Sequence, residues 1–274
     1  MCVHKKRDKI GRTLLMIVAG LTAAGLFAAR LQAQDFVLSQ NGKSVGKASL
    51  HVDKQGAILA AKSEADIKMP GLDYKFSENA SLDAGYHLAS AKLSGSVNGT
   101  SAKVETTKQG QQFLMKIDAN GNVINTPLAF HSRAVFFPDF DPAALQEVLS
   151  LGAAHNNLDL WALSPKQTGS VVALRIATDA DMQGALNGQP LTVHHLTVTF
   201  GSSKTELFSS PANELLQAEW TDEGFAMVRQ GFKLTPPARP GIPPPAPKQP
   251  ATQQPTQQPA RPAQPPAQAP QPQQ

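Results

Sequence analysis

The serine motif closest to a catalytic signature lies near the N-terminus. Gly42-Lys43-Ser44-Val45-Gly46 has the G-x-S-x-G spacing of a nucleophile elbow, and Ser44 with Lys47 has the S-x-x-K spacing. A nucleophile elbow requires a strand, a sharp turn and a helix, which present the serine above a parallel sheet. Here an Asn-Gly turn signal precedes the serine and alternating residues follow it, so the pattern predicts a hairpin. The same stretch ends like a phosphate-binding loop, but Val37 stands where that loop requires its first glycine.

The histidines and acidic residues offer few candidate metal ligands. His194 and His195 are adjacent, but neighbouring residues of a strand point to opposite faces, so both cannot bind one metal ion. Asp179 and Asp181 are separated by one residue and could share a cation. We expect instead that both are ordinary surface residues without a bound ion. Residues 118–122 resemble a fragment of a calcium loop but lack its closing Glu, so they predict a tight turn. We therefore predict no catalytic residue, no metal, no cofactor and no enzymatic activity.

The formal net charge of +4 arises at the two ends of the chain. Residues 1–33 carry a net charge of +5 and residues 235–274 a net charge of +3. The remaining 16 basic and 20 acidic residues give residues 34–234 a net charge of −4. A segment of that charge repels a phosphate backbone on average, so we expect no nucleic-acid partner.

Residues 1–33 have the layout of a secretory signal peptide. A basic stretch from Lys5 to Arg12 precedes an apolar run of 16 residues, Leu14 to Ala29. That run is shorter than the ~20 residues that span a bilayer as a helix. We expect cleavage after Ala33, with an uncleaved N-terminal anchor as the alternative. Either outcome places the rest of the chain in the periplasm or outside the cell.

Residues 235–274 form a low-complexity tail with 15 of the 22 prolines and 10 glutamines. The tail has too little apolar surface to offset chain entropy by burial, so we predict disorder. Extended as polyproline II, at about 3.1 Å per residue, it would reach on the order of 120 Å. It is a solubilising segment, a spacer, or a docking strand for an envelope protein or the cell wall.

Residues 34–234 show the two-residue alternation that is typical of β-strands. From Leu59 to Met69, for example, apolar or small residues alternate with charged ones. Asn-Gly and similar turn signals recur at short spacing, so adjacent strands must run antiparallel. We predict a mainly β fold, namely a curved antiparallel meander of about eleven strands. The sheet curls into a half-barrel or open barrel to hide its apolar face.

One segment, residues 130–163, breaks the alternation. Asp141 is a suitable N-cap, Pro142 fits the first turn of a helix, and Gly152 can end one. We predict a single short helix over residues 142–151 that acts as a lid or plug on the sheet.

The expected inner face of the sheet is rich in small side chains. Such a face either receives a closely packed helix or leaves a cavity for a ligand. Both interpretations remain open here: the helix at 142–151 fills the space, or a cluster of phenylalanines forms the rim of a cavity. In the second case the candidate ligand-binding residues are Ala61, Ala65, Ala89, Ala91, Phe130, Phe136, Phe137 and Phe140.

The opening hairpin, with Asn41-Gly42-Lys43 and Val45-Gly46 between strands, resembles uncharacterised bacterial periplasmic all-β domain families. The later hairpin at Asn187-Gly188-Gln189-Pro190-Leu191 is similar to theirs as well. The architecture resembles the outer-membrane lipoprotein carriers, in which a curved sheet and helical plugs surround an apolar cavity. Those carriers have an amphipathic helix before the first strand, which this chain lacks, so no carrier residue is transferred to it.

These features together predict a non-catalytic, secreted protein of the cell envelope. It binds an apolar or lipid-like ligand inside its curved sheet. The alternative is an interaction module that docks on another envelope component through a sheet edge or the Pro-rich tail. A hydrolase is disfavoured because no nucleophile–base pair stands out.

Overall fold

The computed structural model describes residues 33–236, except 56–57, 156–158 and 167. The predicted signal peptide and the Pro-rich tail lie almost wholly outside the described residues. Within them the chain forms seventeen strands, one α-helix and one 3-10 helix. None of the described helices is long and apolar enough to cross a membrane.

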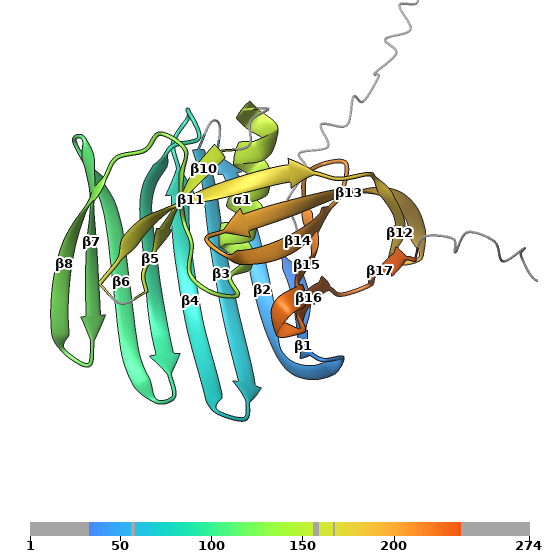
Figure 1. Ribbon diagram of the computed structural model, residues 1–274, viewed down its shortest axis with the longest axis horizontal. Helices are drawn as coiled ribbons and strands as arrows, with labels where there is room; N and C mark the ends of the chain where they lie inside the picture. Colours follow the sequence, from blue (N-terminus) through green and yellow to red (C-terminus); the bar gives the residue numbers. More distant parts are fainter. Residues whose placement is uncertain (1–32, 56–57, 156–158, 167, 237–274) are drawn as a thin grey trace, which may run out of the picture. The chain divides into compact units, whose positions relative to one another are not determined.

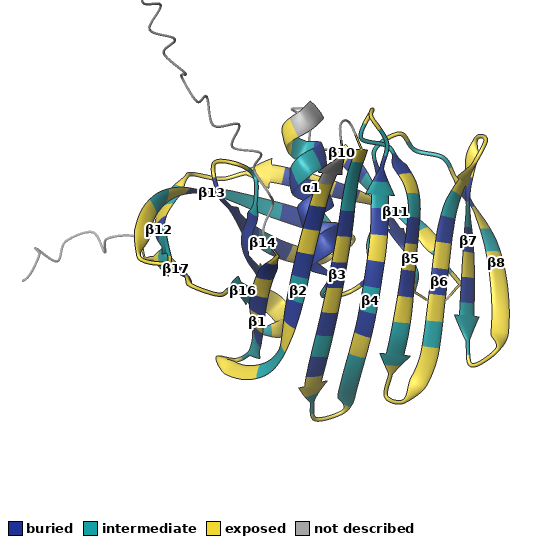
Figure 2. Cartoon of the chain, turned by 180° about the vertical axis from the view of Figure 1, so that it is seen from behind, coloured by how far each residue is buried: buried dark blue, intermediate teal, exposed yellow. Residues whose placement is uncertain are grey.

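The first half of the domain is an antiparallel meander, as the alternation predicted. Three of its hairpins turn at Asn-Gly pairs, at Asn41, Asn98 and Asn120, where both residues have positive φ. This is the conformation of a two-residue type I′ turn, which fixes the strand register. Buried and exposed residues alternate along the strands (Figure 2). The eight strands are β1 (Gln34–Gln40), β2 (Lys43–Gln55), β3 (Ile58–Met69), β4 (Leu72–Leu82), β5 (Leu88–Val97), β6 (Thr100–Gln109), β7 (Gln112–Ala119) and β8 (Asn122–Ala129).

The second half of the domain adds shorter strands that continue the same sheet (Figure 1). The elements are β9 (Ala134–Phe136), α1 (Pro142–His155), β10 (Asp159–Ser164), β11 (Ser170–Thr178), β12 (Met182–Leu186), β13 (Gln189–Phe200), β14 (Ser203–Ser209), β15 (Leu215–Trp220), the 3-10 helix η1 (Thr221–Glu223), β16 (Phe225–Arg229) and β17 (Phe232–Thr235).

Pairing of β1 with β16 joins the two halves into one ladder. The ladder continues through β15, β14, β13, β11 and β10, and ends at β9, which is parallel to β10. The described residues show no pairing between the end strands β8 and β9. The prediction of a mainly β fold with a curved, open sheet and one short helix is therefore confirmed.

The sequence predicted about eleven strands because the C-terminal strands lose their alternation. Four of the seven residues of β14 and the first four of β15 are buried. Strand β12 pairs with β17 and with the start of β13, and this small layer covers a second apolar cluster. That cluster contains Val193, Phe208, Leu216 and Phe232. Strands that are buried on both faces show no clean polar–apolar alternation, so the pattern does not reveal them.

The single helix lies against β2, β3, β9 and β15. Residues 142–149 are all buried, so α1 is surrounded by protein rather than amphipathic. Asp141 is its N-cap, as predicted, because its Oδ1 accepts a hydrogen bond from the Ala143 N–H at 2.8 Å. The helix runs to His155 and does not stop at residue 151. Gly152 stays helical, and a Cβ added there would lie in ordinary van der Waals contact with Ile176 Cδ1 of β11, at 3.5 Å.

The small residues of the inner face divide into two groups. Ala61, Ala65 and Ala91 are buried, as expected. Ala89, however, is exposed, so the prediction that it faces inward is wrong. The register between β4 and β5 shifts at this point, because Ser81 pairs with Ser90 but Leu82 pairs with Leu88. Ala89 is therefore the extra residue of a β-bulge, which changes the face on which it lies.

Enlarging Ala65 tests whether the helix fills the space beside the small residues. We expect Ala65→Leu to lower the free energy of unfolding by about 1–3 kcal/mol, because it forces extra volume into packed structure. The matched change Ala89→Leu, on the exposed bulge, should stay within about 0.5 kcal/mol of the parent protein. Urea unfolding of both variants measures the difference. A neutral Ala65→Leu would show that unfilled space lies next to β3.

Candidate functional site

An apolar pocket of about 270 Å³ lies between the C-terminal half of α1 and strands β11, β13 and β14. The helix supplies Val148, Leu149 and Gly152, and the strands supply mostly branched aliphatic side chains. Such a lining suits an apolar group that is removed from water. The full set is Val148, Leu149, Gly152, Ala153, Ile176, Thr178, His194, Leu196, Val198, Leu207, Ser209 and Asn213.

Two polar side chains border this pocket with different surroundings. Ser209 is only 1% exposed, and its hydroxyl has no hydrogen-bond partner among the described residues. A buried hydroxyl without a partner costs about 1–3 kcal/mol. Ser209 lines the pocket, but its oxygen is covered, so a ligand would meet this oxygen only if the side chain turned toward the pocket. His194 is more exposed, and its Nδ1 is hydrogen-bonded to Asp181 Oδ1 at 2.9 Å.

Three buried carboxyl groups, Glu78, Asp141 and Glu147, gather around the N-terminal half of α1. Each side chain is at most 1% exposed. Asp141 Oδ1 accepts hydrogen bonds from Ser63 Oγ at 2.6 Å and from the Ala143 N–H. The side-chain oxygens of Glu78 and Glu147 have no hydrogen-bond partner among the described residues.

The burial of these carboxyls controls their protonation. Desolvation, followed by the charge of Asp141, raises the pKa of Glu78 and of Glu147 well above the usual range. A proton shared with the nearby Asp141 carboxylate is a further cause of the raised pKa of Glu78, although no Glu78 oxygen has a hydrogen-bond partner among the described residues. The direction of both shifts favours the neutral forms of Glu78 and Glu147, while Asp141 serves as the cap of α1. All three side chains are buried, so they are shielded from solvent.

Aromatic side chains close the region above these carboxyls. Phe140, in a left-handed conformation with φ of 56°, packs on Phe225 at 4.4 Å and on Trp220 at 5.5 Å between ring centroids. Tyr74 meets the same ring edge-on at 6.4 Å. Desolvation, with the charge of Asp139 as the next cause, raises the pKa of Tyr74 above its ordinary value.

The four predicted phenylalanines do not form one cavity rim, and none of them lines the apolar pocket. Phe136 is fully buried in β9, Phe137 packs on Phe200 at 5.5 Å, and Phe140 belongs to the aromatic group just described. Phe130 packs on Phe113 at 5.5 Å. They separate because successive residues of the short strand β9 and its flanks point in different directions. Ala61, Ala65, Ala89 and Ala91 are absent from the pocket lining as well.

A larger groove of about 620 Å³ crosses β1 to β5. Ala65 contributes to it, but so do the charged side chains of Lys47, Glu64, Asp66 and Lys75. Lys75 Nζ lies 3.2 Å from Asp66 Oδ2, and both side chains are solvated. This surface has the character of an ordinary polar sheet face, so it suits an apolar ligand less well than the smaller pocket does.

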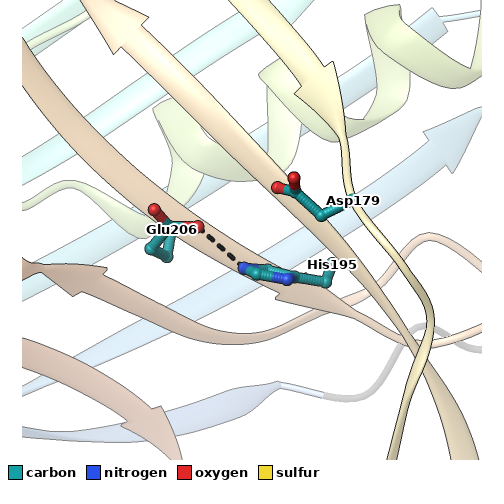
Figure 3. Close-up of side chains that lie close together, drawn as sticks. All are labelled: Asp179, His195 and Glu206. Carbon is teal, nitrogen blue, oxygen red and sulfur yellow. Dashed lines mark hydrogen bonds and ion pairs between the residues drawn. The ribbon is translucent and has the colours of Figure 1, made fainter.

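The histidine and aspartate pairs separate onto two faces of the sheet, as strand geometry predicted for His194 and His195. Asp181 bonds His194 beside the pocket, whereas Asp179 lies next to His195 together with Glu206 (Figure 3). The two aspartates therefore do not share one site. Glu206 was missed by sequence reasoning, although the Gly201 turn between β13 and β14 places it opposite Thr197.

Ser44 occupies a hairpin and not a nucleophile elbow. It lies in β2, directly after the Asn41–Gly42 turn, and pairs with Ser39 of β1. The element that follows it is a long strand rather than a helix.

No protein-family model and no curated protein matches this sequence. A solved structure, that of a DUF1089 family protein from Pseudomonas aeruginosa, is similar with 10% sequence identity and a TM-score of 0.39. The similarity covers 64% of this chain and 90% of that chain. None of these comparisons shows a lipoprotein-carrier family.

The buried carboxyls generate a pH-dependent prediction. A raised pKa in the folded state means that the folded protein binds more protons than the unfolded chain above pH ~4.3. Stability should therefore fall as the pH rises from that value toward the raised pKa. Glu78→Gln keeps a donor to Asp141 without the ionisable group, so it should be more stable than the parent protein at pH 8 and should flatten the pH profile.

Thermal unfolding from pH 4 to pH 9 measures this effect. The exposed substitution Glu64→Gln is the control and should leave the shape of the profile unchanged. If Glu78→Gln loses stability equally at every pH, Glu78 is not held in its neutral form.

Proposed function

We propose that this protein is a non-catalytic binding protein of the cell envelope that holds one small apolar group in its 270 Å³ pocket. The observation that carries the proposal is the combination of an aliphatic lining with the buried, unpartnered hydroxyl of Ser209. An aliphatic chain would be removed from water there, and a polar end of the ligand would satisfy Ser209. The location in the periplasm or outside the cell is inferred from the secretory signal in residues 1–33.

The size of the pocket limits the ligand. Small-molecule pockets usually enclose about 300–1,000 Å³, and this one lies just below that range. It suits a single short acyl chain or one ring and is too small for a lipid with two long chains. The proposed ligand class is thus narrower than the lipid-like ligand expected from the sequence, and none of the four predicted alanines lines the site.

Gly152 allows the pocket to be filled without breaking the helix. Its Cβ position is free of backbone contacts, and its one near neighbour is Ile176 Cδ1. Gly152→Leu should occupy the pocket and weaken decanoate binding at least ~10-fold. Gly152→Ala is the matched control: it should keep binding and raise the free energy of unfolding by about 0.5–1 kcal/mol through helix propensity.

Isothermal titration calorimetry with decanoate measures both variants against the parent protein. Decanoate that binds the parent protein with one site, and loses affinity in Gly152→Leu alone, supports the proposal. Equal affinity in all three proteins, or no binding to the parent protein, contradicts it.

A second candidate is an interaction module that adds a peptide strand to the sheet edge at β8. Val123 and Ile124 in β8 are 49% and 41% exposed, although branched apolar residues are usually buried. An exposed apolar edge strand is a template for β-strand addition. Val123→Lys would block such docking and leave decanoate binding unchanged, so the two candidates are separable.

A further inference from the structure

Three neighbouring strands bring Asp179, His195 and Glu206 together on the face of the sheet opposite the pocket. In the antiparallel register Thr178 pairs with Leu196, so Asp179 reaches the level of His195. Glu206 of β14 pairs with Thr197, which lies on the same face of β13 two residues after His195. One potential ligand atom from each of the three side chains lies within 4.8 Å of the other two (Figure 3).

The three side chains are held in place by contacts that do not depend on a ligand. The His195 ring stacks on Phe208 with 4.7 Å between centroids and 3° between planes. Phe208 is 4% exposed and belongs to the second apolar cluster, so it is a fixed support. Thr197 Oγ1 lies 2.7 Å from Asp179 Oδ2 and 3.0 Å from Glu206 Oε2. The Asp179 N–H donates a hydrogen bond to the His195 carbonyl oxygen at 2.9 Å. This bond fixes the backbone of Asp179 beside His195.

The negative charge at this point is not neutralised by a lysine or arginine. Among the described residues, neither Asp179 nor Glu206 forms an ion pair with Lys or Arg. The hydrogen-bond partners of the Glu206 side chain are His195 Nε2, at 2.7 Å, and Thr197 Oγ1, at 3.0 Å. Glu206 also pairs directly across the ladder with Glu219 of β15. Like charges opposite each other in a sheet are destabilising, so a bound cation would relieve an unfavourable arrangement. The pairing of Glu206 with Glu219 is a separate observation from the closeness of Asp179, His195 and Glu206, and it also favours a bound cation.

We propose that Asp179, His195 and Glu206 bind a divalent first-row transition-metal ion of the Zn²⁺ type. One imidazole and two carboxylates are ligands that such ions accept, at about 2.0–2.2 Å. Ca²⁺ and Mg²⁺ prefer sites made of oxygen ligands, so the imidazole selects against them. His195 Nε2 and one oxygen of each carboxylate coordinate the ion, which displaces the His195–Glu206 hydrogen bond, and water completes the coordination.

Other histidine–carboxylate pairs of the described chain lack a third ligand. His51 Nε2 lies 3.1 Å from Asp53 Oδ1 on the surface of β2, and no further ligand group joins them. This pair consists of a histidine and an aspartate, as in the proposed site, but it lacks the second carboxylate. His51→Gln is therefore a matched control for the loss of one histidine.

Titration of the full, untagged chain with ZnCl₂ at pH 7.5 tests the proposal. We expect one equivalent of Zn²⁺ to bind, with an affinity that falls at least ~10-fold in Asp179→Asn, His195→Gln and Glu206→Gln. His51→Gln should retain the affinity of the parent protein. Bound Zn²⁺ should also raise the unfolding temperature of the parent protein and of His51→Gln, because the ion binds only the folded arrangement.

A second measurement uses the parent protein, so its result does not depend on whether the variants fold. Substoichiometric Mn²⁺ or Co²⁺ should broaden the NMR signals of His195 and Thr197 before those of His51. Broadening that starts at His51, or Zn²⁺ binding that is unchanged in all three ligand variants, would overturn the proposal. Absence of any Zn²⁺ binding at millimolar concentration would overturn it as well. None of these outcomes depends on the apolar pocket, so they leave the proposed function to its own test.

Discussion

Asp141 is the residue on which the attachment of the helix to the sheet depends. One oxygen, Oδ1, accepts a hydrogen bond from the N-terminus of α1 through Ala143 and another from Ser63 of β3. A single carboxylate thus caps the helix and fixes where it begins along the sheet. The helix has no exposed face over residues 142–149, so its position is determined by this bond and by packing. The apolar pocket lies at the other end of α1, between the helix and strands β11, β13 and β14.

The sheet presents two different chemical environments on its two faces. On the inner side, His194, Leu196 and Val198 face α1 and the apolar pocket. On the other side, His195 and Thr197 lie among carboxylates that no described Lys or Arg neutralises. The strict alternation of β13 places a hydrophobic site and a polar site on one strand, one residue out of phase. The two proposed sites therefore share a scaffold without sharing a residue.

The local parts of this fold are predictable from the sequence because they depend on neighbouring residues. The Asn-Gly turns, the alternating strands of the first half and the cap at Asp141 follow from conformational preference and spacing. The length of α1 is not predictable in this way, since Gly152 remains helical although glycine commonly ends a helix. The bulge that turns Ala89 outward is equally hidden, because a shift of register has no compositional signal.

The candidate sites depend on contacts between distant parts of the chain, which one sequence does not reveal. Ser209 and Leu149 line the same pocket only when the sheet curves around the helix. Glu206 joins Asp179 only through the register of β11, β13 and β14. The buried carboxyl Glu78 looks like any exposed glutamate of an alternating strand until α1 covers it. The sequence therefore predicts the architecture, whereas the residues that line the apolar pocket are brought together only by the fold.

The most direct test of the central claim is a crystal structure of the protein grown with decanoate. We expect an acyl chain between Leu149 of α1 and Leu196 of β13, with its polar end within hydrogen-bond distance of Ser209 Oγ. Decanoate bound only in the polar groove of β1 to β5, or an empty space between α1 and β13 at saturating decanoate, would contradict it.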